Sequence, residues 1–256
     1  MLACHNIVEI FIPSKEVEAA RDLSRTLDDT RIDLQRDRQR LSKFLLRHGY
    51  VFSETNPLGQ RKTTWSRDHW KWIDKIKFEG CAHTTYAHYV TPVRCAETDK
   101  KMIEHAVKAE ALSDRWAAVV KALCTIKGID VISAFCLAAE AGCFSRFGFA
   151  EEYASWCGLI PSEYCSGEKK TTGHITKCGN TPSRRTLTEA SWHFISYSVK
   201  PKRLPDGWDV APSISRRGTD CTRRLVKRRS ALMKSGHNSC VVNIAVAREL
   251  ACWVWR

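Results

Sequence analysis

The sequence of 256 residues has no uninterrupted apolar run approaching the roughly 18 residues of a membrane-spanning helix. Its N-terminus lacks the basic start and the long apolar run of a secretory signal peptide. It also contains no internal repeat and no low-complexity tract. From these absences we expect a cytoplasmic protein without a membrane partner. The length of 256 residues leaves room for one large or two small domains.

The sequence also lacks any C-x-x-C pair, although it contains 12 cysteines. Several cysteines stand among apolar residues, where a free cysteine behaves as a small hydrophobic side chain. These are Cys124, Cys136, Cys157 and Cys252. The sequence therefore predicts reduced thiols and no disulfide framework. The group Cys81, His83, His88 and Cys95 matches no common zinc-ligand spacing, so we assign no metal ligand.

Acidic residues are scarce relative to basic ones. The chain has 41 Lys and Arg against 28 Asp and Glu, which gives a net charge of +13, and most of the excess follows Ile160. A basic block of this size favours a polyanionic partner, nucleic acid first and an anionic membrane second. The basic segment 216–234 lacks the aromatic anchors of helices that lie on membranes, so nucleic acid is the preferred partner.

The N-terminal half is dominated by helical patterns after one short strand-like run. Residues 7–12 predict a β-strand that ends at Pro13, and because no partner strand follows, we expect an orphan strand. Ser14 is a suitable N-cap for the next segment. Apolar residues at helical spacing then continue to His48-Gly49 without a breaker, which predicts one long coiled-coil-like helix.

A second long helix is expected further along the chain. Residues 53–64 predict a loop, residues 66–79 a tryptophan-rich helix, and about residues 83–112 a long helix with a start or kink at Pro92. Antiparallel pairing of the two long helices would bury both of their apolar stripes.

From Trp116 onward the sequence predicts a compact helical domain. Two helices flank a tight turn at Lys127-Gly128-Ile129-Asp130. This pattern is typical of a helix-hairpin-helix, whose turn amides bind a nucleic-acid backbone, and equally of a plain αα-hairpin. After a proline-containing loop over 200–215, we expect a basic helix over 216–234 and an apolar closing helix over 241–255. The predicted fold is therefore mainly α.

The stretch from Tyr153 to Glu189 carries the strongest functional signal. An apolar segment stops at Pro161, and a loop dense in Ser, Gly and Lys follows before the next helix begins. Glycines let backbone amides approach a ligand closely, and serines in such a loop are candidate nucleophiles. The pattern predicts a phosphate-binding loop. Its glycine and basic residues are Gly167, Lys169, Lys170, Gly173, Lys177, Gly179, Arg184 and Arg185.

Three blocks of the sequence resemble the DEDD-type insertion-sequence transposases related to the Piv DNA invertase, which are understood as RNA-guided serine recombinases. Residues 21–49 resemble the helix after the family's first domain, residues 126–147 the opening of its C-terminal domain, and residues 153–180 its signature. The most specific strings are Gly158-Leu159-Ile160-Pro161-Ser162 and Gly173-His174-Ile175-Thr176-Lys177-Cys178-Gly179-Asn180. The resemblance covers nearly the whole chain.

The resemblance implies that a loop serine attacks a DNA phosphodiester. Where the family has two serines before a glycine, this sequence has Cys165, Ser166 and Gly167, so Ser166 is the expected nucleophile and Ser162 the alternative. A serine that only contacts phosphate is the simpler interpretation. The residues expected to bind nucleic acid are Lys127, Gly128, Gly167, Lys169, Lys170, Lys177, Asn180, Arg184, Arg185, Arg223, Arg224 and Arg228.

The resemblance also shows one departure. The family begins with an RNase H-like (RuvC-like) domain whose four acids bind a divalent metal such as Mg²⁺. Here only ten residues precede Phe11-Ile12-Pro13-Ser14, which resembles a run near the end of that domain, and Glu9 is their only acid. We therefore expect residues 1–13 to be a remnant of that domain, 14–115 a coiled-coil helical region and 116–256 the serine-bearing domain. The resemblance thus implies a truncated or split copy, without a metal or other cofactor of its own and inactive alone.

The expected partners are DNA, a structured guide RNA and a second copy of the chain, paired through the long helices. The alternative is a non-catalytic nucleic-acid-binding protein that modulates an intact transposase through mixed assemblies. A helical zinc-binding protein is a third interpretation, which stoichiometric metal in the purified protein would favour.

Overall fold

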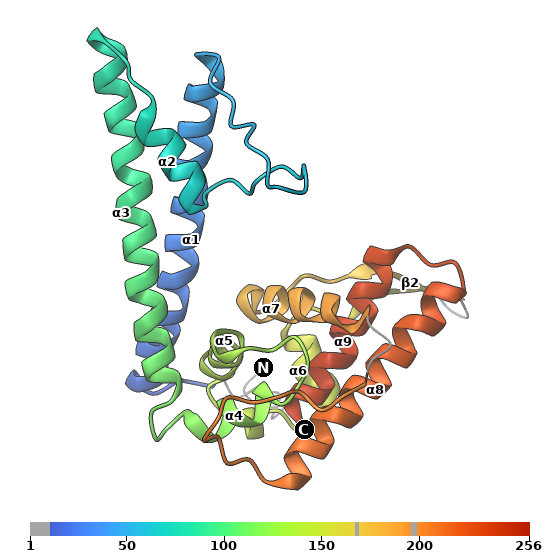
Figure 1. Ribbon diagram of the computed structural model, residues 1–256. Helices are drawn as coiled ribbons and strands as arrows, with labels where there is room; N and C mark the ends of the chain where they lie inside the picture. The colour runs from blue at the N-terminus through green and yellow to red at the C-terminus, as the bar shows by residue number, and fades with distance from the viewer. Residues whose placement is uncertain (1–10, 167–168, 196–198) are drawn as a thin grey trace. The chain divides into compact units, whose positions relative to one another are not determined.

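The structure is a computed structural model that describes residues 11–166, 169–195 and 199–256. The protein is mainly α-helical, as the sequence predicts (Figure 1). In chain order the elements are α1 (Lys15–Arg47), α2 (Arg67–Lys75), α3 (Gly80–Ala111), α4 (Ala117–Cys124), α5 (Val131–Ala141), the 3₁₀ helix η2 (Phe144–Arg146), α6 (Ala150–Trp156), β1 (Pro161–Ser166), β2 (Lys169–Ile175), α7 (Thr181–Ser191), the 3₁₀ helix η3 (Trp192–Ile195), α8 (Pro212–Lys234) and α9 (Ser239–Trp255).

The N-terminal strand predicted over residues 7–12 falls largely outside the described residues. Residues 11–14, which the structure does describe, have no regular secondary structure. Helix α1 starts directly after Ser14, whose Oγ accepts a hydrogen bond from the amide of Val17 at 3.4 Å. The predicted N-cap is therefore confirmed.

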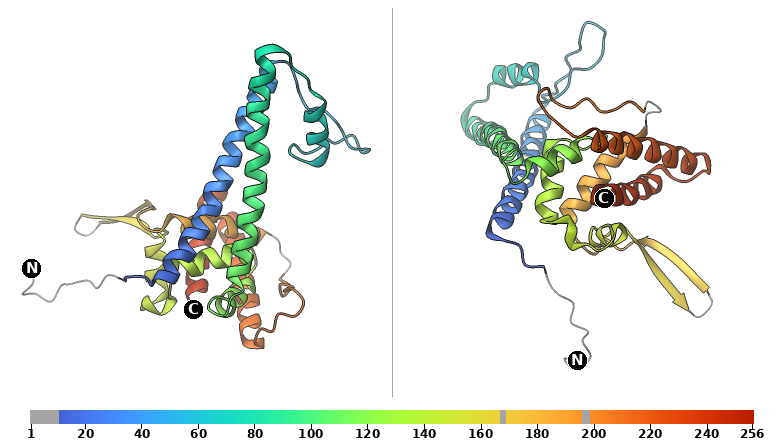
Figure 2. Two further views of the ribbon diagram at one scale, coloured as in Figure 1. Left: turned by 90° about the vertical axis from the view of Figure 1, so that its left-hand side faces the viewer. Right: turned by 90° about the horizontal axis from the view of Figure 1, so that it is seen from below.

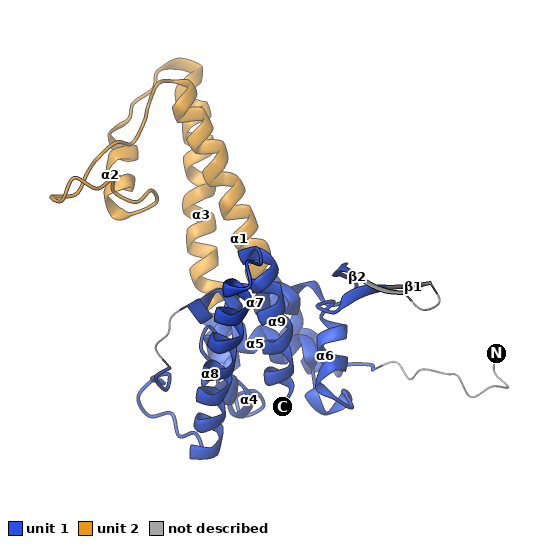
Figure 3. Ribbon diagram, turned by 90° about the vertical axis from the view of Figure 1, so that its right-hand side faces the viewer, with its two compact units in different colours: residues 1–25, 105–256 blue, residues 26–104 orange. Residues whose placement is uncertain are grey.

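The chain forms two compact units, residues 26–104 and residues 1–25 with 105–256 (Figure 3). Inside the first unit, α1 and α3 run antiparallel, as predicted. Arg31 pairs with Glu104 at 3.7 Å, and Arg38 further along α1 pairs with Glu97, which lies earlier in α3, at 2.6 Å. The two apolar stripes thereby face each other.

Helix α2 adds a third side to the core of this unit. Ile73 of α2 is completely buried, and its carbonyl accepts a hydrogen bond from the Tyr86 hydroxyl at 2.7 Å. Helix α3 continues through Pro92, so the predicted alternative that a helix starts there is wrong. A proline inside a helix removes one backbone hydrogen bond. The neighbouring Val93 is completely buried, and its packing offsets that loss.

In the other unit, α9 packs against α6, α7 and α8. The apolar closing helix is confirmed and begins slightly earlier than predicted, with Asn238 as its N-cap. The basic helix α8 also begins earlier, at Pro212 rather than at Arg216. The reason is that a proline is well tolerated in the first turn of a helix, where its missing N–H has no helical partner.

Residues 161–175, predicted as a loop, form an antiparallel hairpin of β1 and β2. Figure 2 shows this hairpin extending away from the helices of its own unit. The loop prediction is wrong because the density of Ser, Gly and Lys concealed a strand pattern. Tyr164, Thr171 and Thr172 are residue types that favour strands, and the two intervening residues begin with Gly167, which is a typical hairpin spacing.

The cysteines that the structure describes with their side chains are free thiols. Cys124, Cys136 and Cys157 are buried and Cys252 is partly buried, so they act as small hydrophobic side chains as predicted. Burial raises the pKa of Cys124 to about 11 and that of Cys157 to about 12, which keeps both thiols protonated at neutral pH. Across the described parts of the chain, no helix combines the length and the apolar character needed to cross a membrane.

Candidate nucleic-acid interface

The expected nucleophile lies at one end of the hairpin. In the strand register Ser166 is opposite Lys169, and Cys165 is opposite Lys170. The backbone positions of the serine and of two basic neighbours are therefore adjacent. Gly167 lies outside the described residues, as do the side chains of residues 164–172. For these residues the structure gives the pairing of the two strands and not the positions of the side chains.

The alternative nucleophile, Ser162, lies near the other end of the same hairpin. Its Oγ donates a hydrogen bond to the carbonyl oxygen of His174 at 3.1 Å, across the two strands. A serine whose proton is already held by a backbone carbonyl has a structural role in the hairpin.

Backbone hydrogen bonds close the base of the hairpin onto the end of α6. They join the segment that enters the hairpin to the segment that leaves it, so the hairpin is anchored at both ends. In each bond a backbone amide donates to a backbone carbonyl oxygen: that of Thr176 to Ile160 at 2.9 Å, that of Lys177 to Gly158 at 3.2 Å and that of Asn180 to Trp156 at 2.9 Å.

Gly179 lets the segment that leaves the hairpin pass very close to the backbone of Trp156. A Cβ atom at this position would lie 2.2 Å from the carbonyl oxygen of Trp156, and the backbone φ of Gly179 is +134°. We predicted that the glycines of this stretch let amides approach a ligand. At Gly179 the close neighbour is the backbone of the chain itself, so this glycine is required for the fold.

The change Gly179→Ala is therefore expected to lower the free energy of unfolding by about 2–4 kcal/mol, through steric overlap and backbone strain. Gly207→Ala is the matched control, because Gly207 also has a positive φ, +81°, but no atom lies within 4 Å of its added Cβ. Its expected loss is about 1 kcal/mol. Urea denaturation of both variants tests this prediction, and equal losses would contradict it.

Lys177 is exposed and has an uncommon backbone conformation. Its φ is +55°, and Trp65 is the other non-glycine residue with a positive φ in the described part of the chain. For a residue with a Cβ atom this left-handed conformation costs about 1–2 kcal/mol. Such strain persists where the surroundings fix it, and it occurs frequently at functional sites.

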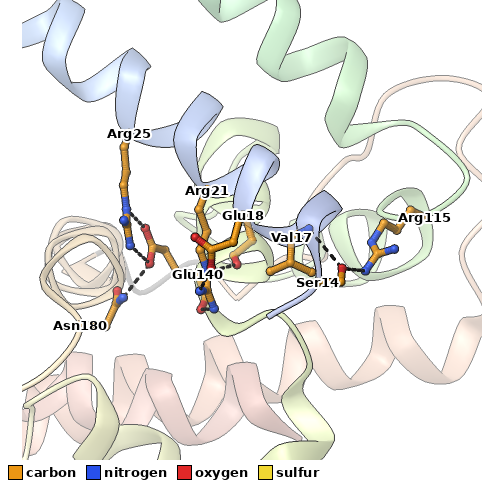
Figure 4. Close-up of polar contacts among 9 residues, drawn as sticks. Ser14, Val17, Glu18, Arg21, Arg25, Arg115, Glu140 and Asn180 are labelled. Carbon is orange, nitrogen blue, oxygen red and sulfur yellow. Dashed lines mark hydrogen bonds and ion pairs between the residues drawn. The ribbon is translucent and has the colours of Figure 1, made fainter. Parts of the chain in front are cut away.

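A buried carboxylate, Glu140 of α5, connects the helices beside the hairpin (Figure 4). Its side chain is 1% exposed and accepts two hydrogen bonds from Arg25, at 2.8 and 2.9 Å. These bonds raise the pKa of the Arg25 guanidinium. Arg21, one turn earlier on α1, donates to the backbone carbonyls of Ala139 and Glu140 at 3.0 and 2.8 Å. The first turns of α1 are thereby fixed to the end of α5.

The same carboxylate also holds Asn180. The Asn180 Nδ2 atom donates to Glu140 Oε2 at 2.7 Å, while its Oδ1 accepts from the amide of Ser183 at 2.8 Å and caps α7. Asn180 was predicted to bind nucleic acid. In the structure both ends of its amide are bonded within the chain, and they position the segment that leaves the hairpin.

Arg184 and Arg185 are consecutive residues in the first half of α7, but their environments differ. Arg184 is half-buried and donates to the Cys157 carbonyl at 3.1 Å and to Thr181 Oγ1 at 2.9 Å. Arg185 is exposed. Arg184 therefore supports the base of the hairpin, while Arg185 extends the basic surface.

The turn at Lys127 and Gly128 packs against the opposite end of α7. Gly128 has a φ of +85°, and a Cβ there would lie 2.6 Å from the carbonyl oxygen of Ala190. The half-buried Lys202 donates to the carbonyls of Ile126 and Ile129 on either side of the turn. Burial lowers the pKa of Lys202. These contacts are those of an αα-hairpin stabilised within the chain.

Three arginines predicted to bind nucleic acid, Arg223, Arg224 and Arg228, are exposed on α8. Arg224 donates to Glu249 of α9 at 2.5 Å, and Arg228 lies 3.9 Å from the same carboxylate. Arg223 pairs with Asp220 at 2.5 Å. Exposed ion pairs of this kind are weak, so these guanidinium groups stay available to a phosphate.

The predicted binding residues thus occupy three places. Lys177, Asn180 and Arg184 meet at the base of the hairpin, next to the strands that carry Ser166, Lys169 and Lys170. Lys127 and Gly128 lie at the other end of α7, and the arginines of α8 form the third place. Among the described residues, no three His, Cys, Asp or Glu side chains form a group that is suited to a metal ion.

Sequence reasoning missed Glu140 and its partner Arg25. One signal was present, because Glu140 is the single charged residue of the apolar helix Val131–Ala141. A carboxylate in such a helix is rarely buried unless it is paired. The identity of the partner was not readable, since Arg25 lies far away in the sequence.

Comparison with known proteins adds a family relationship to this geometry. Residues 120–204, from α4 to the loop before α8, match the model of the Transposase IS116/IS110/IS902 family. This match includes the β1–β2 hairpin and its anchoring residues.

Individual relatives extend the similarity. The putative transposase y4qE of Sinorhizobium fredii is 29% identical over all 256 residues, which cover 61% of that protein. The transposase for insertion sequence element IS1533 of Leptospira borgpetersenii is 30% identical over 189 residues, 72% of this chain and 52% of that protein. A probable family 20 transposase of Pseudomonas aeruginosa is 33% identical over 85 residues, 33% of this chain and 24% of that protein. The chain is therefore related to the transposases of insertion sequences, and it spans less than two thirds of their length.

Proposed function

We propose that this chain acts on DNA as the serine-bearing part of an insertion-sequence transposase, with Ser166 as the nucleophile. The observation that carries the proposal is the position of Ser166. It ends strand β1 opposite Lys169, inside the segment that matches the transposase family model. Ser162, the rival residue, has its hydroxyl engaged by a backbone carbonyl.

In the proposed step the Ser166 Oγ attacks the phosphorus of a DNA phosphodiester. An Oγ–P bond forms, the bond from phosphorus to one sugar oxygen breaks, and the serine proton leaves to a base while the sugar oxygen takes up a proton. The product is a covalent phosphoserine. Lys169 and Lys170 belong to the facing strand, and positive charge there stabilises the added negative charge of the transition state.

We propose that DNA is held by the basic residues around the hairpin base and on α8. Lys177 and Arg185 are exposed next to the hairpin, and the α8 arginines are exposed on the same unit. Contacts of this kind release counterions from the DNA, so binding is expected to weaken steeply as the salt concentration rises.

Two further partners belong to the proposal. The resemblance to RNA-guided recombinases implies a structured guide RNA. The long helices α1 and α3 are proposed to pair with a second copy of the chain. Sedimentation at several protein concentrations tests the pairing.

The four-acid Mg²⁺ site that the resemblance implies has no counterpart in the part of the chain that the structure describes, because no group of three suitable side chains occurs there. The whole transposition reaction is proposed for an assembly in which this chain acts with further protein.

A suicide-substrate assay tests the proposed chemistry. Labelled DNA of an element end, with an interruption that prevents religation, is incubated with the protein and the RNA transcribed from the flanking sequence. A protein–DNA band that survives denaturation is the expected result. If this band is absent even when an intact relative is added to the reaction, the proposal is wrong.

A second candidate function is a non-catalytic nucleic-acid-binding protein that modulates an intact transposase. It is favoured by the exposed arginines of α8, Arg223, Arg224 and Arg228, which can contact phosphates without any reactive side chain. Salt-sensitive DNA binding without a covalent band, together with inhibition of an intact relative, is the result that would support it.

A further inference from the structure

A groove of about 520 Å³ lies between the base of the hairpin and α9. Its volume falls within the range of about 300–1,000 Å³ that is usual for ligand sites. The walls are aliphatic and come from both elements. The apolar lining residues are Leu159, Pro161, Ile175, Val241, Ile244 and Ala245.

The polar residues of the groove are nearly all basic. Lys177 and His174 come from the hairpin side and Arg248 from α9, and all three are exposed. No acidic residue is among the described residues that line the groove. Neither Lys177 nor Arg248 forms an ion pair within the described part of the chain, so both charges are available to an anion.

Two features of the groove lining are unusual. Lys177 keeps its left-handed backbone, with a φ of +55°, although glycine would adopt this conformation without strain. Val241 is 59% exposed, which is unusual for a valine on a helix whose other apolar residues are mostly buried. A charged side chain is therefore held at the rim of an uncovered apolar wall.

We propose that this groove binds one unpaired nucleotide of the DNA substrate, with the base against the aliphatic walls and the phosphate against Lys177 and Arg248. The inference rests on the proposed function, because it assigns the site to a DNA strand that reaches the hairpin. Enzymes that modify a DNA base hold the extruded base in a pocket between aromatic or apolar side chains. Here the apolar walls and the cationic rim match the two halves of a nucleotide.

A nucleotide fits this groove better than another protein segment does. A hydrophobic peptide would fill the apolar walls and leave the charges of Lys177 and Arg248 without partners beside it. An isolated phosphate would engage the two cations and leave the walls, including Val241, exposed to water. A nucleotide satisfies both parts of the lining at once.

The test compares two DNA duplexes that differ by one base. One carries a single unpaired adenine, and the other carries an abasic residue at the same position. Fluorescence anisotropy with the full chain measures both dissociation constants. We expect the duplex with the adenine to bind about tenfold more tightly, because the adenine covers apolar surface of the aliphatic walls and an abasic residue does not.

Two variants test the two halves of the site separately. Lys177→Gly removes a charge that faces the phosphate and also relieves the left-handed strain, so the fold is kept and both duplexes are expected to bind more weakly. Ala245→Phe fills the groove without changing the charge and is expected to abolish the preference for adenine. Lys108→Ala removes another exposed lysine of the same unit and is expected to keep both the affinity and the preference. Thermal unfolding of each variant confirms that it is folded.

Equal binding of the two duplexes by the unchanged protein would overturn the proposal. A changed sedimentation coefficient of the DNA-free protein in Val241→Asp would overturn it as well, because a second copy of the chain would then cover the groove. The two assays distinguish a failure of the nucleotide site from a failure of Ser166 as the nucleophile. Adenine preference without a covalent band would remove only Ser166 as a nucleophile, and a covalent band without adenine preference would remove only the nucleotide site.

Discussion

Ser166→Ala is expected to abolish covalent attachment of DNA, with a loss of a factor on the order of a thousand or more in the rate of adduct formation. The reason is that alanine has no atom that can bond to phosphorus, while the hairpin and its basic residues are unchanged. Ser166 lies at the end of β1 that is remote from the hairpin base, where Pro161 pairs with Ile175. DNA affinity is therefore expected to stay within about twofold of the unchanged protein.

Ser162→Ala provides the matched comparison within the same strand. This change removes the hydrogen bond of 3.1 Å to the His174 carbonyl. It is expected to lower the free energy of unfolding by about 1 kcal/mol and to keep the covalent adduct. An adduct that survives Ser166→Ala and disappears in Ser162→Ala would exchange the roles of the two serines.

Glu140→Ala is expected to lower the free energy of unfolding by about 2–3 kcal/mol. Removing one partner of a buried ion pair typically costs about 3–5 kcal/mol. The Arg25 side chain is 49% exposed, so its guanidinium can turn toward water and part of that loss is avoided. The carboxamide of Asn180 also loses its acceptor.

The effect should reach the exit of the hairpin. Without Glu140, Asn180 caps α7 less firmly, so the amide of Ser183 is expected to exchange its hydrogen faster. Glu18→Ala is the control, because Glu18 is a half-exposed acid that pairs with Arg21 on α1, and its expected change is within about 0.5 kcal/mol. Similar losses for Glu140→Ala and Glu18→Ala in urea denaturation would show that the buried network does not hold the unit together.

The long helices were predictable because their signals are local. The apolar spacing of α1 continues over many turns, and Ser14 marks its start, so the pattern identifies both the helix and the face that pairs with α3. Helix boundaries were less certain. Pro92 was compatible with a helix start or with a kink, and Pro212 with a loop or with the first turn of a helix, and the local sequence does not distinguish these alternatives.

The candidate site was predictable only in part. Its serines, glycines and basic residues stood out by composition, and the resemblance to transposases singled out Ser166. The hairpin was missed because residues that bind phosphate and residues that form strands alternate in the same segment. The roles of Gly179 and Glu140 depend on Trp156 and Arg25, and these contacts exist only once the chain is folded.

The measurement that tests the account most directly is mass spectrometry of the protein after trapping on the interrupted DNA substrate. Trypsin cleaves after Arg146 and Lys169, so one peptide contains both serines and fragment ions separate them. The account predicts a nucleotide adduct on Ser166. An adduct on Ser162 or on another residue would contradict it.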